Sequence, residues 1–387
     1  MFFKSAIALA LFASILAGAD LTVHEWGTFT SIAGEDGAAE RWVSLSPPAD
    51  LPCFVYHLSA QCIKCGLNRV RMETPVLYFY AAQPMTASVH VDLPSGLITE
   101  WYPKAVQVSG LQAGMTYDSG GNIEWKKVQV LPGATDEFPN AGDSSHYYAA
   151  RETDATPLRV DDQPEKVLFY RGIADFDIAL RPRFLSDGKL EIRNAGADSV
   201  GFAVVFENRG GKTGYRVIHD LRSTALVDSP ELSGNVEAVQ RELATALTAA
   251  GLYPKEAAAM IATWGDSWFE EGMRIFYVAP RKTVDAVLPI RIAPSPAAME
   301  RAFVGRMELF SPAMKKTIQT ALEAGDTKTL GKYGRFLRPF CDRLAAANQV
   351  RMSPAAQAFL ARSAQAAARP ASSPCRVEPQ ALPTDQR

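Results

Sequence analysis

The sequence lacks the short motifs that mark several common enzyme classes. It contains no His-Glu-x-x-His motif of zinc proteases, no Gly-x-Ser-x-Gly nucleophile motif and no phosphate-binding glycine loop. It also lacks a basic block, because its 40 Lys and Arg residues are balanced by 42 Asp and Glu residues, for a net charge of −2. Without concentrated positive charge nothing favours binding to a phosphate backbone, so we expect no nucleic-acid partner.

Long apolar runs are absent after the first twenty residues. The chain begins with a short segment that contains Lys4, continues with an apolar run over 6–16, and then reads Ala-Gly-Ala up to Ala19. This order is typical of a cleavable secretion signal, and the run is shorter than the roughly 20 residues of a membrane span. We expect cleavage between Ala19 and Asp20, a periplasmic or secreted mature protein, and no transmembrane segment after cleavage. An uncleaved anchor is the alternative.

Cysteine is scarce, and its distribution is uneven. Three of the five cysteines lie with His57 in one short cluster, and an exported chain can keep disulfides. We expect a disulfide within this cluster, with a tetrahedral zinc site or reduced thiols as the alternatives, and no other cofactor. The odd count leaves at least one thiol outside a disulfide within the chain. The disulfide candidates are Cys53, Cys62, Cys65, Cys341 and Cys375, and the alternative zinc ligands are Cys53, His57, Cys62 and Cys65.

Short runs rich in β-branched and aromatic residues recur from position 21 to about 221, between clusters of Gly, Pro, Asp and Asn. This pattern is typical of β-strands joined by turns. Residues 87–93 alternate between apolar and polar side chains, which predicts a half-buried antiparallel strand. Asp187-Gly188 separates two further runs and indicates a hairpin. Regular short strands with little helix between them favour a sandwich-like arrangement.

The apolar period changes to that of a helix at Val236. Asn235 is suited to cap that helix and Gly251 to end it, and a second helix is expected from Pro254 to just before Gly265. Two strands are expected over 273–278 and 286–292. Three Ser-Pro pairs then predict helix starts, because Ser suits the cap and Pro the first helical position. These pairs are Ser295-Pro296, Ser311-Pro312 and Ser353-Pro354, and a further helix is expected over 328–347.

The expected fold class is therefore α+β, with an antiparallel β-sandwich-like N-terminal region, a mixed connecting region and a helical C-terminal region. The chain length of 387 residues exceeds what one hydrophobic core usually serves. We expect a signal peptide over 1–19, a β-rich domain over 20–225, a mixed α/β region over 226–293, a helical region over 294–368 and a disordered tail over 369–387.

Three segments of the chain resemble stretches of exported bacterial proteins of unassigned function. They read His-Glu-Trp-Gly-Thr-Phe-Thr at 24–30, Glu-Thr-Pro-Val-Leu-Tyr-Phe-Tyr at 73–80 and Lys-Val-Leu-Phe-Tyr-Arg-Gly at 166–172. The resemblance implies a bacterial envelope setting, and it implies no activity and no catalytic residues.

The main candidate site is the connector over 140–154. It holds Asp143, His146, Tyr147 and Arg151 between two strand-rich stretches, and loops held at both ends often carry binding sites. His146 offers a switchable donor or acceptor. Arg151 offers a fixed fork of donors for a carboxylate or sugar hydroxyls. The alternative is a polar loop whose side chains cap its own backbone.

His24 and Glu25 are a second candidate, because together they resemble an acid/base pair. Adjacent residues on a strand point to opposite faces, so we expect His24 to share a face with Trp26, and Glu25 with Val23. That separation favours a hydrogen-bonding role for His24 in the folded structure over catalysis. His24 also stays a candidate binding residue.

These observations favour a non-enzymatic binding module that recognises an unknown envelope or extracellular partner or a glycan. The alternative is a secreted hydrolase in which His146 works with a nearby carboxylate such as Asp143 or Glu152. An enzyme would gather His24, His146 and Arg171 around one cleft. A binding module would instead present an aromatic or apolar patch.

Overall fold

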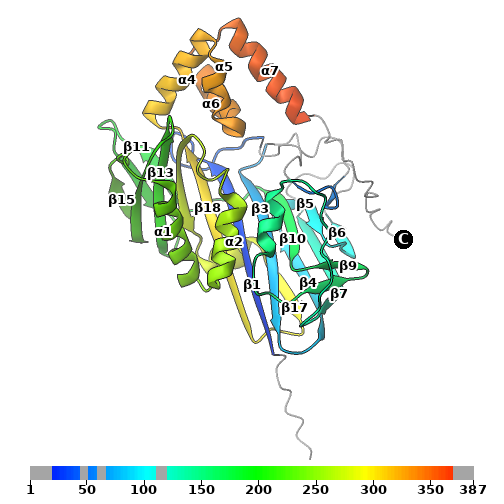
Figure 1. The fold of residues 1–387 in the computed structure, drawn as a ribbon. Helices are drawn as coiled ribbons and strands as arrows, with labels where there is room; N and C mark the ends of the chain where they lie inside the picture. Colours follow the sequence, from blue (N-terminus) through cyan, green and yellow to red (C-terminus); the bar gives the residue numbers. More distant parts are fainter. Residues whose placement is uncertain (1–19, 44–50, 59–66, 110–119, 369–387) are drawn as a thin grey trace, which may run out of the picture.

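The computed structural model describes residues 20–43, 51–58, 67–109 and 120–368. Its centre is a nine-stranded sheet in which segments far apart in the chain lie side by side (Figure 1). The strand order is β14 (Lys212–Leu221), β13 (Val200–Arg209), β16 (Gly272–Val278), β18 (Ala298–Leu309), β1 (Leu21–Ile32), β3 (Val70–Ala81), β10 (Leu168–Ala174), β5 (Gly96–Tyr102) and β2 (Tyr56–His57).

The pairing of β1 with β18 makes this a mixed sheet, because the two central strands run parallel and the other neighbours run antiparallel. This corrects the antiparallel N-terminal region that the sequence predicts, because β1 of that region pairs in parallel with a strand from the C-terminal region. Both strands are buried over most of their length on both faces. Both strands mix buried polar residues such as Glu25 and Arg306 with apolar ones, and this local pattern does not reveal the direction of a partner strand that is distant in the chain.

Two smaller sheets complete the β structure. A six-stranded sheet has the order β17 (Ile290–Ala293), β4 (Met85–Leu93), β7 (Gly121–Val130), β8 (Leu158–Val160) and β9 (Gln163–Glu165), with β6 (Gln107–Ser109) also paired to β7. A three-stranded sheet has the order β11 (Leu180–Phe184), β12 (Leu190–Asn194) and β15 (Thr224–Val227). The hairpin expected at Asp187-Gly188 joins β11 to β12, and Gly188 takes a φ of +84° there.

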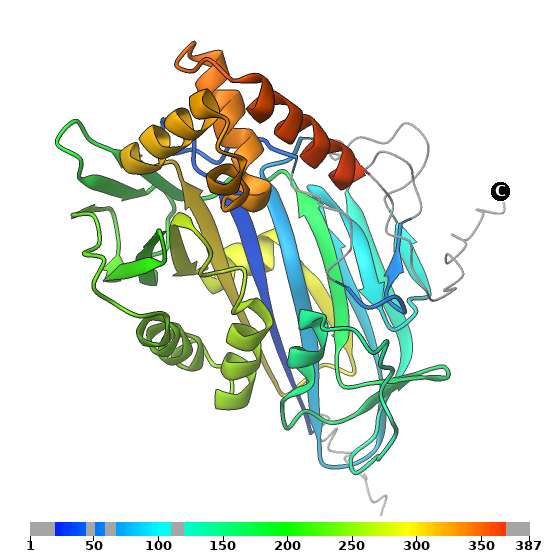
Figure 2. The same ribbon diagram turned by 45° about the horizontal axis from the view of Figure 1, so that its top comes forward.

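The nine-stranded sheet has a core on each face. On one face its side chains share a hydrophobic cluster with the six-stranded sheet, where Trp125 of β7 contacts Tyr170 of β10. Alternate residues of β4 from Ala87 to Leu93 enter this cluster, as the sequence predicts. The other face is covered by α1 (Val236–Ala249), α2 (Pro254–Trp264) and the short 3-10 helix η3 (His146–Arg151), as Figure 2 shows.

Several helix ends follow the local sequence signals. The side chain of Asn235 accepts a hydrogen bond from the backbone N–H of Ala238, which caps α1. Ser311 accepts one from Met314 at the start of α4 (Pro312–Ala324), and α7 (Pro354–Ala368) begins after Ser353. These ends could be predicted because a cap satisfies backbone N–H groups only a few residues away.

Two helix predictions were wrong. Ser295-Pro296 leads into β18, not a helix, because the residues that follow are buried between β16 and β1 and tertiary pairing overrides a local start signal. The helix expected over 328–347 is broken into α5 (Thr327–Gly331), η4 (Gly334–Phe336) and α6 (Leu337–Ala346).

The nine-stranded sheet crosses the region boundaries that the sequence suggested. It takes β1 from region 20–225, β16 from region 226–293 and β18 from region 294–368. The short helix α3 (Arg281–Val287) precedes β17 in the middle region. The α4–α7 helices pack on one end of the sheet, and their apolar side chains join the core that the two larger sheets share (Figure 1). The expected tail over 369–387 lies outside the described residues.

The two cysteine groups have different outcomes. Cys341 on α6 is a free thiol that is 1% exposed, and burial raises its pKa to about 12, which makes it unreactive. Its candidate partner Cys375 lies outside the described residues, as do Cys62 and Cys65. The disulfide expected within the first cluster therefore stays a prediction, with zinc as its alternative.

Within the described ranges, no helix has both the length and the apolar character that crossing a membrane requires.

Candidate ligand pocket

The 140–154 segment contains the 3-10 helix η3. Ser145 caps this helix by accepting a hydrogen bond from the backbone N–H of Tyr147 at 3.2 Å. Asp143 accepts one from the backbone N–H of Ser145 at 3.1 Å. Asp143 therefore orders the turn before η3, which is the backbone-capping role that the sequence offered as its alternative.

Arg151 is occupied by the protein itself. Its guanidinium donates to both carboxylate oxygens of Glu165, at 2.8 and 2.5 Å, and Tyr147 donates to the same carboxylate at 2.9 Å. Glu165 is fully buried, so it depends on these donors. Four aromatic rings surround the guanidinium at 5.1–5.9 Å, and they belong to Phe54, Phe138, Tyr147 and Tyr148. Arg151 and Tyr147 thus bind η3 to the buried carboxylate of Glu165, an acceptor that the sequence alone did not identify.

The structure separates the two candidate histidines. His24 Nδ1 lies 2.8 Å from Glu256 in the first turn of α2, whereas His146 Nδ1 lies 3.3 Å from Asp266, just after α2 ends. An eleven-residue helix is about 16 Å long, so the two imidazoles sit near opposite ends of it. Arg171 contacts Thr74 and Phe169 in the sheet. These three residues therefore contact different parts of the structure.

His24 and Glu25 point to opposite faces of β1, as the sequence predicts. His24 is packed against the rings of Tyr253 and Tyr80 on the helix-covered face. Glu25 lies on the other face, where Arg301 donates to it at 2.5 Å and Tyr170 also donates to it. Both side chains are buried, so each belongs to a separate interior network.

A pocket of about 480 Å³ opens between α1 and the nine-stranded sheet. Sites for small molecules usually have volumes of roughly 300–1,000 Å³. One wall is a stripe of α1 residues at helical spacing, which includes Glu242, Ala246 and Ala249. Phe202 of β13 and Val278 of β16 line it from the sheet. This pocket could not be predicted from the sequence, because its walls come from segments that are distant in the chain.

The remaining wall of the pocket carries charge. It is formed by Arg281 at the start of α3 and by Glu300 on β18, whose charged atoms lie 3.9 Å apart. Glu300 is the register partner of His24 across the β1–β18 ladder, about one strand spacing away on the same face. The turn after α1 passes directly over Glu300 at Gly251. A β-carbon at Gly251 would lie 2.8 Å from Glu300 Cγ, and φ is +101°, so glycine suits this position.

His219 also borders the pocket, from the edge strand β14. The residue is exposed, and its ring centroid lies 6.1 Å from that of Phe202. An edge strand has a neighbour on one side only, so its side chains stay more accessible than an alternating pattern implies.

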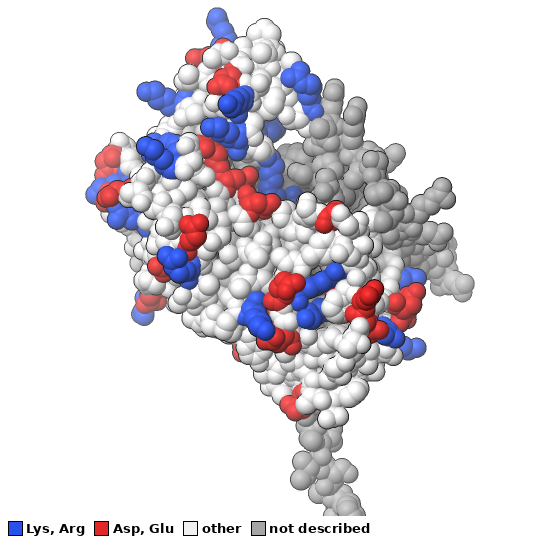
Figure 3. All heavy atoms as spheres, viewed as in Figure 1, with Lys and Arg blue, Asp and Glu red and all other residues white. Residues whose placement is uncertain are grey.

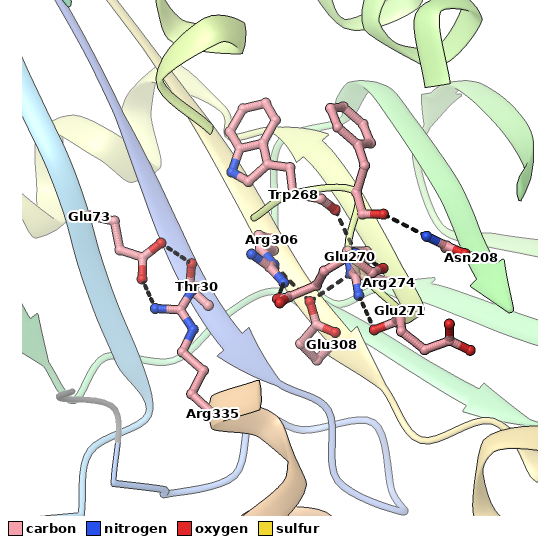
Figure 4. A network of polar contacts seen from close by, with 11 residues as sticks. Thr30, Glu73, Asn208, Trp268, Glu270, Glu271, Arg274, Arg306, Glu308 and Arg335 are labelled. Carbon is pink, nitrogen blue, oxygen red and sulfur yellow. Dashed lines mark hydrogen bonds and ion pairs between the residues drawn. The ribbon is translucent and has the colours of Figure 1, made fainter. Parts of the chain in front are cut away.

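A second polar cluster lies in the interior at the helical end of the sheet (Figure 4). Glu308 lies between the guanidinium groups of Arg274 and Arg306, at 2.8 and 2.7 Å. Beside it, Arg335 of η4 pairs with Glu73 of β3. The cluster joins strands to the C-terminal helices, so we assign it a structural role.

On the face drawn in Figure 3, positive and negative side chains are interspersed.

The contact between Arg151 and Glu165 leads to a prediction in which Arg151 and His146 contribute differently to stability. Arg151→Ala removes two charge-assisted hydrogen bonds from buried Glu165, so we expect it to lower the free energy of unfolding by about 2–3 kcal/mol. His146→Ala breaks a contact with the exposed Asp266, so the expected loss is under about 1 kcal/mol. Urea unfolding of the two single variants measures both values. Equal small losses would show that Glu165 does not depend on Arg151.

Comparison with known proteins returns no matching family model and no matching curated protein. Among solved structures, the Mu homology domain of Fcho1 from Danio rerio, with bound Eps15 peptide, matches at 7% identity and a TM-score of 0.31. The match covers 75% of this chain and 96% of that one. A yeast delta-COP-I mu-homology domain matches with the same coverage, 8% identity and a TM-score of 0.24. Similarity at this level carries no argument about function.

Proposed function

We propose that this protein is a binding module that acts after export and holds its ligand in the pocket between α1 and the nine-stranded sheet. The observation that carries the proposal is the pocket itself, whose apolar lining is bordered by a few charged groups. Burial of apolar surface supplies affinity, and a small number of placed polar groups supplies orientation. We further propose that the scaffold is sandwich-like, and export rests on the secretion-signal pattern over 1–19.

The position of the pocket supports a binding role better than the segment over 140–154 does. Its walls belong mostly to a helix and to strands of the nine-stranded sheet, and sites on such elements hold their geometry more precisely than sites on loops. In the 140–154 segment, by contrast, Tyr147 and Arg151 are engaged with Glu165. The hydrolase alternative draws on one observation, the 3.3 Å contact between His146 and Asp266.

A tryptophan placed in the pocket tests the proposal. Ala249 lies in the pocket lining and is exposed, so we expect Ala249→Trp to fill part of the cavity with little effect on folding. The matched control is Thr248→Trp, at the adjacent exposed position of α1 outside the lining. The uncharged apolar dye Nile red serves as the probe, and its fluorescence reports binding to the native protein.

We expect saturable binding of the dye to the unmodified protein and to Thr248→Trp, with about tenfold weaker binding to Ala249→Trp. Panels of envelope glycan fragments and short peptides, measured as competitors of the dye, then separate the two ligand classes. Equal dye binding by the two tryptophan variants would place the ligand elsewhere. Dye binding that never saturates would remove the binding proposal for this pocket.

A further inference from the structure

We infer that the pocket selects ligands in which an apolar body carries a cationic group, with Glu242 and Glu300 as the two carboxylates that receive the cation. This inference rests on the proposed function and adds the chemical class of the ligand. The supporting observation is that the arginines around the pocket are paired with carboxylates of the protein, whereas Glu242 and Glu300 are less engaged.

The two arginines among the lining residues are already paired with carboxylates of the protein. Arg301 donates to Glu25 at 2.5 Å and to Asp285 at 2.8 Å, and its side chain is fully buried. Arg281 donates from Nε to both oxygens of Asp285 at 2.9 Å, and from Nη1 to the backbone carbonyl of Met299. A ligand anion would have to compete with these existing acceptors for either group.

The two carboxylates of the lining are less engaged. Glu300 has 45% of its side chain exposed, and its contact with Arg281 is 3.9 Å long, near the limit for an ion pair. Glu242, half-exposed on α1, has no ion-pair partner among the residues that the structure describes. The carboxylates that line the pocket are therefore more available to a ligand than its two arginines, so the pocket favours a cation.

The apolar part of the ligand has its own contacts. Phe202, Ala246 and Val278 provide an aromatic and aliphatic part of the pocket lining. A simple metal ion or a small polyamine would leave this surface against water. An alkyl or aryl group joined to an ammonium or guanidinium would cover it and also place its charge near the carboxylates.

A series of probes that differ only in charge tests the inference. The probes are 4-phenylbutylamine, 4-phenylbutanol and 4-phenylbutyrate, each measured by displacement of Nile red from the full mature chain. We expect the amine to bind about tenfold more tightly than the alcohol, and the carboxylate to bind most weakly. The double variant Glu242→Gln, Glu300→Gln should remove most of the advantage of the amine and leave alcohol binding unchanged. Glu237→Gln, an exposed position of α1 outside the lining, is the matched control.

The source of the cation is tested with a second pair of probes. An acetylated and amidated Phe-Lys dipeptide is compared with its Phe-norleucine counterpart, which lacks the ammonium group. If the unmodified protein binds the Phe-Lys dipeptide more tightly than the Phe-norleucine dipeptide, and the double variant does not, the result supports a basic peptide as ligand. If the protein prefers 4-phenylbutylamine but binds the two dipeptides equally, the result supports a free amine. Equal affinity for the three phenylbutyl probes, or tighter binding of the carboxylate, overturns the inference about the cation. The proposed pocket is tested separately by the Ala249→Trp variant. Absence of Nile red binding would overturn the proposed function itself.

Discussion

Glu308→Ala should lower the free energy of unfolding by about 4 kcal/mol, the largest loss that we expect from a single substitution in this protein. Glu308 accepts a hydrogen bond from Arg306 and lies 2.8 Å from Nε of Arg274. Both arginine side chains are fully buried. Removing the carboxylate leaves them in the interior without their shared counter-charge, and a buried charge without a partner is far more costly than an exposed one.

The remaining contacts of the two arginines limit the expected loss. Arg306 also pairs with Glu270, and Arg274 donates to the backbone carbonyls of Trp268, Glu270 and Glu271 (Figure 4). These acceptors keep part of the hydrogen bonding. Urea unfolding followed by circular dichroism measures the loss. Glu323→Ala, at an exposed position of α4, is the control and should change stability by less than about 0.5 kcal/mol. A loss below about 1 kcal/mol in Glu308→Ala would contradict the proposed charge pairing.

Glu73→Gln should cost about 3 kcal/mol at neutral pH and make stability less sensitive to acid. Thr30 donates to the Glu73 carboxylate at 3.0 Å, Arg71 lies 3.1 Å from it, and Arg335 also pairs with it. Burial alone would raise the pKa of Glu73. The nearby guanidinium groups of Arg335 and Arg71 outweigh burial and hold the pKa well below its usual range.

The direction of the pH dependence follows from that lowered pKa. In the unfolded chain a glutamate has a pKa near its ordinary value of about 4.3, so the unfolded state takes up the proton first as pH falls. The stabilisation by Glu73 is therefore fully present above about pH 5 and is lost as pH falls below 4 toward the folded-state pKa.

We expect the difference in unfolding free energy between the unmodified protein and Glu73→Gln to shrink between pH 6 and pH 3, as urea unfolding at each pH can show. Asp342→Asn, which breaks an exposed pair with Arg338, is the control and should have an effect under about 1 kcal/mol at every pH. Because Arg335 belongs to η4, the same titration should loosen the C-terminal helices from β3 first. A difference that is independent of pH would show that Glu73 is not charged in the folded state.

Local signals in the sequence predicted a large part of the secondary structure. The alternation of β4 reports burial on one face, and the Asn235 and Ser311 caps act on backbone groups within three residues. The wrong helix prediction at Ser295-Pro296 has a physical reason. The segment that follows enters the middle of a sheet, and its partners β1 and β16 are distant in the chain.

The candidate site was much less predictable. Asp143, His146, Tyr147 and Arg151 were close in sequence, but the fold directs Tyr147 and Arg151 to Glu165 and His146 to Asp266. His24 pairs with Glu256, 232 positions away. A carboxylate that is buried against a distant cation looks, in the sequence, like any other charged surface residue. No local pattern could therefore reveal these pairs.

By itself, the sequence determined the features that depend on neighbouring residues: the strand alternation, the helix caps, the opposite directions of His24 and Glu25, and the secretion-signal pattern on which the export proposal rests. Only the tertiary structure decided the parallel pairing of β1 with β18, the charge clusters and the pocket beside α1. The physical reason is the range of the interactions. Backbone geometry and capping act over a few residues, whereas a pocket and a buried ion pair exist only after packing brings distant segments together.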